Sequence, residues 1–213
     1  MNALLVGGGS KWGAEYTKLL VSKGYHCHLI TSSNPEIPNT TVHSVDWFNL
    51  SAYTVEEIVK KLPRLDLIFF NQNHFGGPND PDFNIETPFD YNALDRWSRS
   101  HWIDNQLPVY IIKQLKNRIH STTKVGWMLT GFIGESNDNT NWKYAGYGSK
   151  KFTNLAIARG FSGRHPGIFF ALEPGKIDPE QRAEVAVAVD QVVGNLTEKD
   201  SGYAFHLDGT KWL

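Results

Sequence analysis

Short apolar runs alternate along the chain with longer segments in which apolar residues recur at helical spacing. Each run has five or six residues, a length typical of strands that are buried on both faces of a sheet. The predicted strands are residues 2–6, 25–30, 41–45, 65–70, 124–129, 167–172 and 203–207. The predicted helices are residues 14–22, 51–62, 89–119 and 179–196, together with a helix that carries Tyr147 and Lys151. This alternation predicts an α/β fold of three layers, in which helices flank a doubly wound parallel β-sheet.

Two side chains refine the predicted helices. Ser51 is a candidate N-cap, because its hydroxyl can accept a hydrogen bond from a free backbone N–H of the first turn. Pro108 lies inside the longest predicted helix and predicts an interruption around its position, because proline cannot donate a backbone hydrogen bond. The polar, proline-rich residues 78–88 before that helix are predicted to form a surface loop.

Composition and charge narrow the class of protein. The 213 residues suffice for one complete core, so we expect residues 1–213 to form a single domain. The formal net charge is −1 and the basic residues are scattered, which argues against a nucleic-acid partner. No apolar stretch approaches the roughly 18 residues of a membrane span, and no basic leader precedes the first apolar run. The lone cysteine, Cys27, reads as a small core residue, and we expect a cytoplasmic protein.

A glycine-rich turn follows the first predicted strand. Glycines at such a junction let the backbone approach a pyrophosphate, whose charge is stabilised by the free N–H groups of the next helix. The position of this turn in an alternating chain is typical of a Rossmann-type dinucleotide site, although a turn without a ligand is the alternative interpretation. The candidate phosphate-binding residues are Gly7, Gly9, Ser10, Lys11, Trp12 and Gly13.

The end of the second predicted strand bears on the choice of dinucleotide. NAD-binding sites place a carboxylate there, where it holds the ribose hydroxyls and repels a 2′-phosphate. In this chain the position holds Thr31, Ser32 and Ser33, whose hydroxyls can bind a phosphate. Lys11 could add a positive charge, or could simply be solvated. The sequence therefore favours NADP(H) over NAD(H).

Tyr147 and Lys151 form the candidate catalytic pair. Residues four apart lie on one face of a helix, so the lysine ammonium can approach the phenol. A nearby cation lowers the pKa of a phenol from about 10 towards neutral pH, where the phenol can donate or accept a proton. The alternative interpretation is an ordinary solvated helix face, because this spacing is common.

Taken together, these motifs resemble those of the short-chain dehydrogenase/reductase family, in its single-domain branch. The resemblance covers nearly the whole chain. Gly7 and Gly13 match the first and last glycines of the family's T-G-x-x-x-G-x-G loop, while Lys11 replaces the middle glycine and Val6 the threonine. Further matches are Asp46 near the adenine, followed by Trp47; Asn71 of the family's N-N-A-G motif, followed by Gln72; and the turn with Pro174, Gly175 and Ile177 beside the nicotinamide.

The resemblance also implies the active-site residues. The helix-borne asparagine of the family corresponds to Asn105, and its active-site serine falls on Thr130. It implies hydride transfer between NADP(H) and a small carbonyl or alcohol substrate. Tyr147 would be the general acid/base, Lys151 would lower its pKa and hold the nicotinamide ribose, Thr130 would bind the substrate oxygen, and Asn105 would support a proton path. It further implies a homodimer or homotetramer that associates through the helices bearing Asn105 and Tyr147.

Other interpretations stay open. The altered glycine loop and Thr130 are compatible with a dinucleotide-binding sensor or scaffold without turnover, although Tyr147 and Lys151 argue against it. The substrate pocket is expected to be open, or covered by residues 75–88 or 136–142. His74, His101 and His165 each stand alone in their segments and are predicted to be ordinary histidines, so no metal site is expected.

Overall fold

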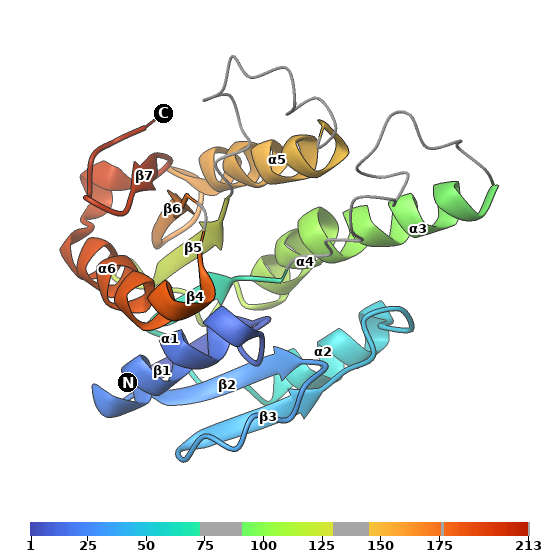
Figure 1. Cartoon of the computed structure of the whole chain (residues 1–213), viewed down its shortest axis with the longest axis horizontal. Helices are drawn as coiled ribbons and strands as arrows, with labels where there is room; N and C mark the ends of the chain where they lie inside the picture. Colours follow the sequence, from blue (N-terminus) through green and yellow to red (C-terminus); the bar gives the residue numbers. More distant parts are fainter. Residues whose placement is uncertain (73–90, 130–144, 176, 213) are drawn as a thin grey trace.

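Seven parallel strands form one sheet in the order β3-β2-β1-β4-β5-β6-β7, which confirms the predicted doubly wound α/β fold (Figure 1). The structure is a computed structural model that describes residues 1–72, 91–129, 145–175 and 177–212. The strand order reverses between the neighbouring strands β1 and β4, so the connections that follow their carboxyl ends leave in opposite directions and open a crevice. The strands are β1 (Asn2–Val6), β2 (His26–Thr31), β3 (Thr40–Ser44), β4 (Leu67–Phe70), β5 (Lys124–Met128), β6 (Ile168–Glu173) and β7 (Ala204–His206).

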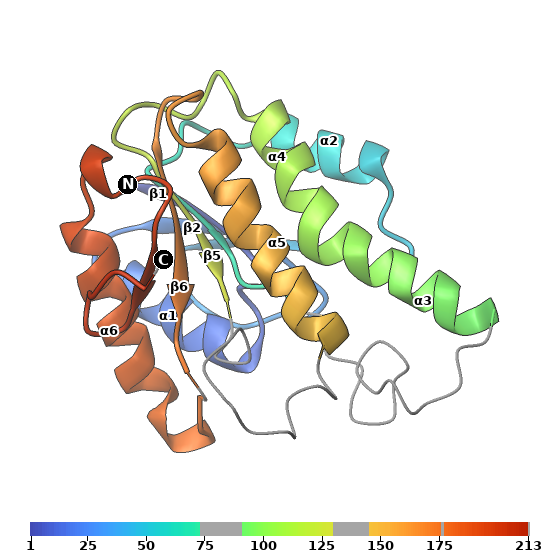
Figure 2. The ribbon, with the colours of Figure 1, turned by 90° about the horizontal axis from the view of Figure 1, so that it is seen from above.

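Both faces of the sheet are covered by helices, and Figure 2 shows the three layers from above. Leu4 and Val6 of β1 pack into a core with α2, α4 and α5, whereas Ala3 and Leu5 pack on the opposite face with α1 and α6. Successive strand residues point to opposite faces, so continuous apolar runs are needed to fill both cores. The helices are α1 (Lys11–Ser22), α2 (Ala52–Lys60), α3 (Tyr91–His101), α4 (Leu107–Gln114), α5 (Ala145–Phe161) and α6 (Arg182–Asn195).

Helix α1 begins three residues earlier than the hydrophobic pattern predicts. Ser10 is its N-cap, and the serine hydroxyl accepts a hydrogen bond from the backbone N–H of Gly13 over 3.1 Å. That contact stabilises the first turn, which contains the poor helix former Gly13. The glycine-rich turn therefore consists of residues 7–10, and Lys11 is the first residue of the helix.

The long predicted helix is interrupted near Pro108, as predicted, and the interruption lies just before the proline. Helix α3 passes into a π-helical turn, η1 (Trp102–Gln106), which leads directly into α4. In that turn the Leu107 N–H bonds to the Trp102 carbonyl, five residues back. Pro108 has no N–H to offer the carbonyl of residue 104, so the ladder changes register just ahead of it, and the proline lies in the first turn of α4.

The carboxyl-terminal helix also differs from the prediction. Residues Pro179–Gln181 form a 3-10 turn, η3, and α6 starts only at Arg182. A second short 3-10 turn, η4 (Glu198–Asp200), leads towards β7. Within the described ranges, no helix is both long and apolar enough to cross a membrane.

Candidate functional site

A cavity of about 540 Å³ lies where β1, β2 and β4 end. It occupies the crevice at the reversal of strand order, the usual ligand site of a doubly wound sheet. The residues that line it come from the turn after β1, the first turn of α1, the end of β2, the loop after β3, the end of β4 and the π turn η1. They are Gly7, Gly9, Ser10, Lys11, Trp12, Thr31, Ser32, Ser33, Trp47, Phe48, Asn71, Gln72 and Ile103.

Glycines are required in the turn after β1 for steric reasons. Gly7 has φ of +83°, and a Cβ at this position would lie 2.7 Å from the backbone nitrogen of Gln72. A Cβ on Gly13 would lie 2.5 Å from the Gly7 carbonyl oxygen. Both contacts are far shorter than van der Waals distance, so these glycines let the turn, α1 and the end of β4 approach closely.

The end of β2 is tied to this turn by hydroxyl groups. The Ser33 hydroxyl donates to the Gly9 carbonyl over 2.8 Å, and the Thr31 hydroxyl lies 3.0 Å from the Ser33 hydroxyl. Thr31 is buried, whereas Ser32 and Ser33 are exposed at the cavity. Lys11 is also exposed there, at the amino end of α1, and no acidic residue occupies the first turn of that helix.

The end of β4 holds the other side of the turn. The Asn71 side-chain amide donates to the Ser10 hydroxyl over 2.9 Å. Gln72 is buried, and its side-chain amide donates to the Ile103 carbonyl over 3.2 Å. The glycine turn, the end of β4 and the π turn are therefore connected by side-chain hydrogen bonds.

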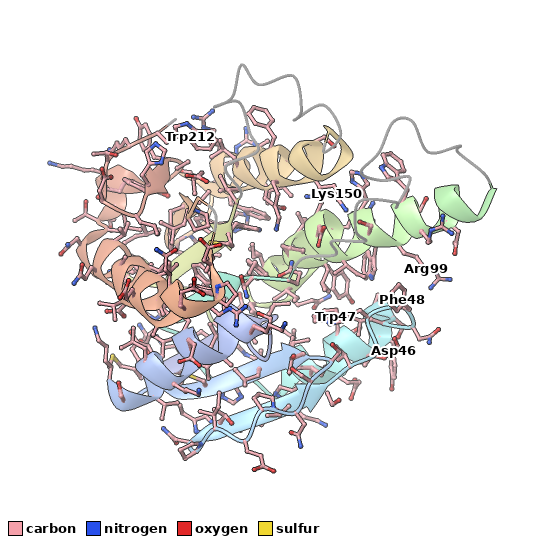
Figure 3. The ribbon with its side chains drawn as sticks, viewed as in Figure 1. Asp46, Trp47, Phe48, Arg99, Lys150 and Trp212 are labelled. Carbon is pink, nitrogen blue, oxygen red and sulfur yellow. The ribbon has the colours of Figure 1, made fainter. Side chains whose placement is uncertain are left out.

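The loop after β3 forms the outer wall of the cavity. Trp47 and Phe48 line it, and a guanidinium N–H of Arg99 in α3 donates to the Phe48 carbonyl (Figure 3). The Asp46 carboxylate accepts hydrogen bonds from the Phe48 N–H (3.0 Å) and the Asn49 side chain (2.6 Å), and chiefly the Asn49 bond lowers its pKa. Asp46 thus bonds within its own loop and does not line the cavity.

The π turn connects the cavity to helix α5. Ile103 lines the cavity, and Asn105, two residues on, is buried. The Asn105 side-chain amide donates to the Lys150 carbonyl over 2.7 Å and to the Asn154 side-chain oxygen over 2.9 Å. The wider π turn thus places Asn105 against the helix that carries the candidate catalytic pair.

Lys151 is almost fully buried, with 2% of its surface exposed. Its Nζ donates to the Met128 carbonyl at the end of β5 over 3.3 Å. Burial lowers the pKa of the Lys151 ammonium, and the negative charge of Asp104 acts in the opposite direction. Tyr147 lies one turn earlier in α5, as predicted; its phenol and the whole of Thr130 lie outside the described part of the structure.

The turn after β6 was predicted to lie beside the nicotinamide. Gly175, which follows Pro174, has φ of +66°. Its N–H donates to the buried Glu173 carboxylate over 2.8 Å. Ile177 packs against the core that contains α1 and α6. None of Pro174, Gly175 and Ile177 lines the 540 Å³ cavity, and neither Gly13 nor Lys151 does, so any binding role of these residues stays a prediction.

Sequence reasoning missed four residues of this region. Phe48 and Ile103 line the cavity, and their only signal was that Phe48 follows the predicted Trp47 and Ile103 lies two residues before the predicted Asn105. Lys150 and Asp104 form a fully buried ion pair, with Nζ and Oδ2 3.4 Å apart. The available signal was that Asp104 precedes the predicted Asn105 and Lys150 precedes the predicted Lys151. The burial of this pair could not be predicted from sequence. No cluster of potential metal ligands occurs among the described residues.

The fold of this chain is also found in solved short-chain dehydrogenase/reductases. A carbonyl reductase from Pseudomonas aeruginosa PAO1 superposes with a TM-score of 0.79, covers 99% of this chain and 98% of its own, and is 15% identical. BdcA in complex with NADPH gives a TM-score of 0.75 at 16% identity, over 96% and 91% of the two chains. A short-chain dehydrogenase/reductase from Serratia marcescens gives 0.74 at 15% identity, over 96% and 94%. No protein-family model and no curated protein sequence matches the chain.

Proposed function

We propose that this protein is an NADP(H)-dependent oxidoreductase of the short-chain dehydrogenase/reductase type, acting on a small carbonyl or alcohol substrate. The observation that carries the proposal is the physical connection between the 540 Å³ cavity and helix α5. Gln72 in the cavity wall bonds to Ile103, and Asn105 in the same turn bonds to Lys150, the residue before Lys151. A dinucleotide site and a Tyr-x-x-x-Lys helix are thereby parts of one framework.

The cavity fits a dinucleotide on steric and electrostatic grounds. Gly7 and Gly9 contribute only backbone to the cavity wall, so a pyrophosphate could approach the turn closely, and the amino end of α1 supplies free N–H groups. Lys11 adds a cation at the positive end of that helix, a placement that is unfavourable by itself and favourable beside an anion. Trp47 and Phe48 offer flat apolar surfaces to an adenine ring.

The preference for NADP(H) rests on the end of β2. Ser32, Ser33 and Lys11 meet at the cavity, and no carboxylate occupies positions 31–33. The Ser33 hydroxyl already donates its proton to the Gly9 carbonyl. Ser32 and Lys11 are therefore the side chains best placed to bind a 2′-phosphate. An exposed lysine and a hydroxyl provide charge-assisted hydrogen bonds to such a group.

The nicotinamide supplies or accepts the hydride, and the chain supplies proton transfer and placement. In the proposed mechanism Tyr147 protonates the carbonyl oxygen during reduction and deprotonates the alcohol in the reverse direction. Lys151 favours the phenolate by its charge and orients the nicotinamide ribose, Thr130 binds the substrate oxygen, and Asn105 supports the path by which Tyr147 regains its proton. The buried position of Lys151 strengthens its effect on a neighbouring phenol, because burial reduces solvent screening.

The decisive test is cofactor binding followed by turnover. We expect NADPH to bind more tightly than NADH when nicotinamide fluorescence is followed, and a panel of ketones and aldehydes to contain a substrate that consumes NADPH. Tyr147→Phe should bind NADPH with unchanged affinity and lose turnover by about 1,000-fold or more. Binding without turnover in the wild type would favour the alternative, a dinucleotide-binding sensor or scaffold. Absence of binding would contradict the cofactor assignment.

A further inference from the structure

Two consecutive lysines of α5 are buried, although lysine side chains are rarely buried in proteins. Lys150 is 0% exposed and Lys151 is 2% exposed. Their side chains reach different partners. Lys151 Nζ donates to the Met128 carbonyl of β5, whereas Lys150, which lies between α5 and α3 in Figure 3, donates to the Ser100 hydroxyl. A buried ammonium needs charged or strongly polar partners to stay protonated.

Asp104 of the π turn supplies the negative charge. It is 0% exposed, and its carboxylate lies 3.4 Å from the Lys150 ammonium. The next residue, Asn105, holds the same lysine through its backbone carbonyl. Two successive residues of η1 therefore contact Lys150: Asp104 contacts its side chain and Asn105 its backbone carbonyl. Lys150 immediately precedes Lys151 in the sequence.

The charge of Asp104 extends beyond its direct partner. Burial lowers the pKa of Lys151, and Asp104 is the group that opposes this. Burial and the Lys150 charge lower the pKa of His101, which lies one turn before Asp104; Asn105 and Asp104 act in the opposite direction. His101, Lys150 and Lys151 are thus three bases under the influence of one buried carboxylate.

We propose that Asp104 and Lys150 form a positioning pair that keeps Lys151 charged and oriented towards Tyr147, one turn earlier on α5. This inference rests on the proposed function. Without the carboxylate, the ion pair with Lys150 is lost, and the negative charge that opposes the effect of burial on the Lys151 ammonium is lost with it. Lys151 would then lose its proton at lower pH, and its influence on the Tyr147 phenol would weaken. Neither Asp104 nor Lys150 needs to touch substrate or cofactor for this role.

The first test measures the charge of Lys151 directly and needs no turnover. NMR titration of lysines labelled at Cε, with Lys151 assigned from Lys151→Arg, reports its pKa in each variant. We expect Asp104→Asn to lower the pKa of Lys151 by about one pH unit, because the opposing charge is lost. Lys150→Met should raise it, because the charge of Asp104 is then no longer offset by its ion-pair partner. Opposite shifts in the two variants support the pair, and an unchanged Lys151 titration in either folded variant overturns it.

The second test uses catalysis. In Asp104→Asn the pH limb of kcat that depends on Tyr147 should move up by about one unit, with the KM for NADPH changed less than about threefold. Glu57→Gln, which removes an exposed carboxylate from α2, should leave kcat, KM and the pH limb unchanged. If Asp104→Asn lowered the free energy of unfolding and left the pH limb of kcat unmoved, the pair would have only a structural role. If even the wild type turns over no substrate, the proposed function fails while the NMR shifts still decide the pair.

Discussion

The side-chain amide of Asn71 donates to the hydroxyl of Ser10 over 2.9 Å, which joins the end of β4 to the cap of α1 across 61 positions of sequence. The same hydroxyl accepts a hydrogen bond from the Gly13 N–H, so Ser10 both caps α1 and binds the residue that follows β4. The shape of the glycine turn therefore depends on a residue far away in the chain.

Removal of this amide is expected to weaken cofactor binding. In Asn71→Ala, a hydrogen bond worth about 1 kcal/mol is lost, and the Kd for NADPH should rise about fivefold because the glycine turn is held less firmly. Fluorescence titration measures the Kd. Asn195→Ala, at the exposed end of α6, is the matched control and should bind NADPH like the wild type. An unchanged Kd in Asn71→Ala would show that the turn keeps its shape without this bond.

The glycine at position 7 is expected to be indispensable. Gly7→Ala introduces a Cβ that meets backbone atoms at 2.7 Å in a positive-φ conformation, so we expect unfolding to become easier by about 1–3 kcal/mol and NADPH binding to be lost. Denaturant unfolding and fluorescence titration measure the two effects. In Gly160→Ala the new Cβ meets nothing within 4 Å in helix α5, and this control should be neutral or slightly stabilised.

The charge of Lys11 is expected to distinguish the two dinucleotides. In Lys11→Ala, the Kd for NADPH should rise roughly fivefold to tenfold, since a charge-assisted contact with the 2′-phosphate is lost at an exposed position. The Kd for NADH should change less than about twofold. Lys18→Ala removes an exposed lysine from the same helix and should alter neither value. Equal loss for both dinucleotides would assign Lys11 to the shared pyrophosphate instead.

Acid is expected to destabilise the fold through β2. Burial, followed by the charges of His26 and His43, lowers the pKa of His28 from 6.5 to about 4. The unfolded chain therefore binds one more proton than the folded chain between these values. The contribution of His28 is complete above pH 6.5 and is lost as the pH falls to about 4, with a slope of at most about 1.4 kcal/mol per pH unit.

Urea unfolding at closely spaced pH values measures this dependence. His28→Gln should show a shallower decline of the free energy of unfolding between pH 6.5 and 4. His165→Gln, outside β2 and β3, is the control and should follow the wild-type curve. Parallel curves for all three proteins would contradict the assignment to His28.

The sheet could be predicted from sequence because inner strands such as β4 and β6 carry continuous apolar runs, a local property that records burial on both faces. The edge strand β3 is mostly polar and only partly buried, so its own sequence is a weaker signal. The cavity wall could be predicted in large part for a related reason. Its residues follow directly after strands, so topology alone brings Gly9, Ser33 and Asn71 to one edge. The start of α1 was missed because Lys11, Trp12 and Gly13 have no helical pattern, and the cap that overcomes this is a hydrogen bond in three dimensions.

The buried ion pair marks the limit of local reasoning. Asp104 and Lys150 each look like solvated residues in their own segments, and only the packing of η1 against α5 makes them partners. Pro108 correctly indicated an interruption nearby, but its local sequence could not show that the interruption is a π turn or that the proline lies in the first turn of α4. The proposed roles of Tyr147 and Thr130 still rest on sequence.

The π turn can also be regarded as one surplus residue stored in a helix. A π turn closes with an i→i+5 hydrogen bond and an α turn with an i→i+4 bond, so each makes about one full turn and the π turn holds one residue more. Deletion of one residue within 102–106 would therefore restore a regular helix and leave α3 facing as it does now relative to α4. Arg99 in α3 would keep its contact with the Phe48 loop, whereas the shortened turn would no longer present both Asp104 and Asn105 to Lys150. The length of the chain through this turn, and not only the chemistry of its side chains, thus sets which residues face the site.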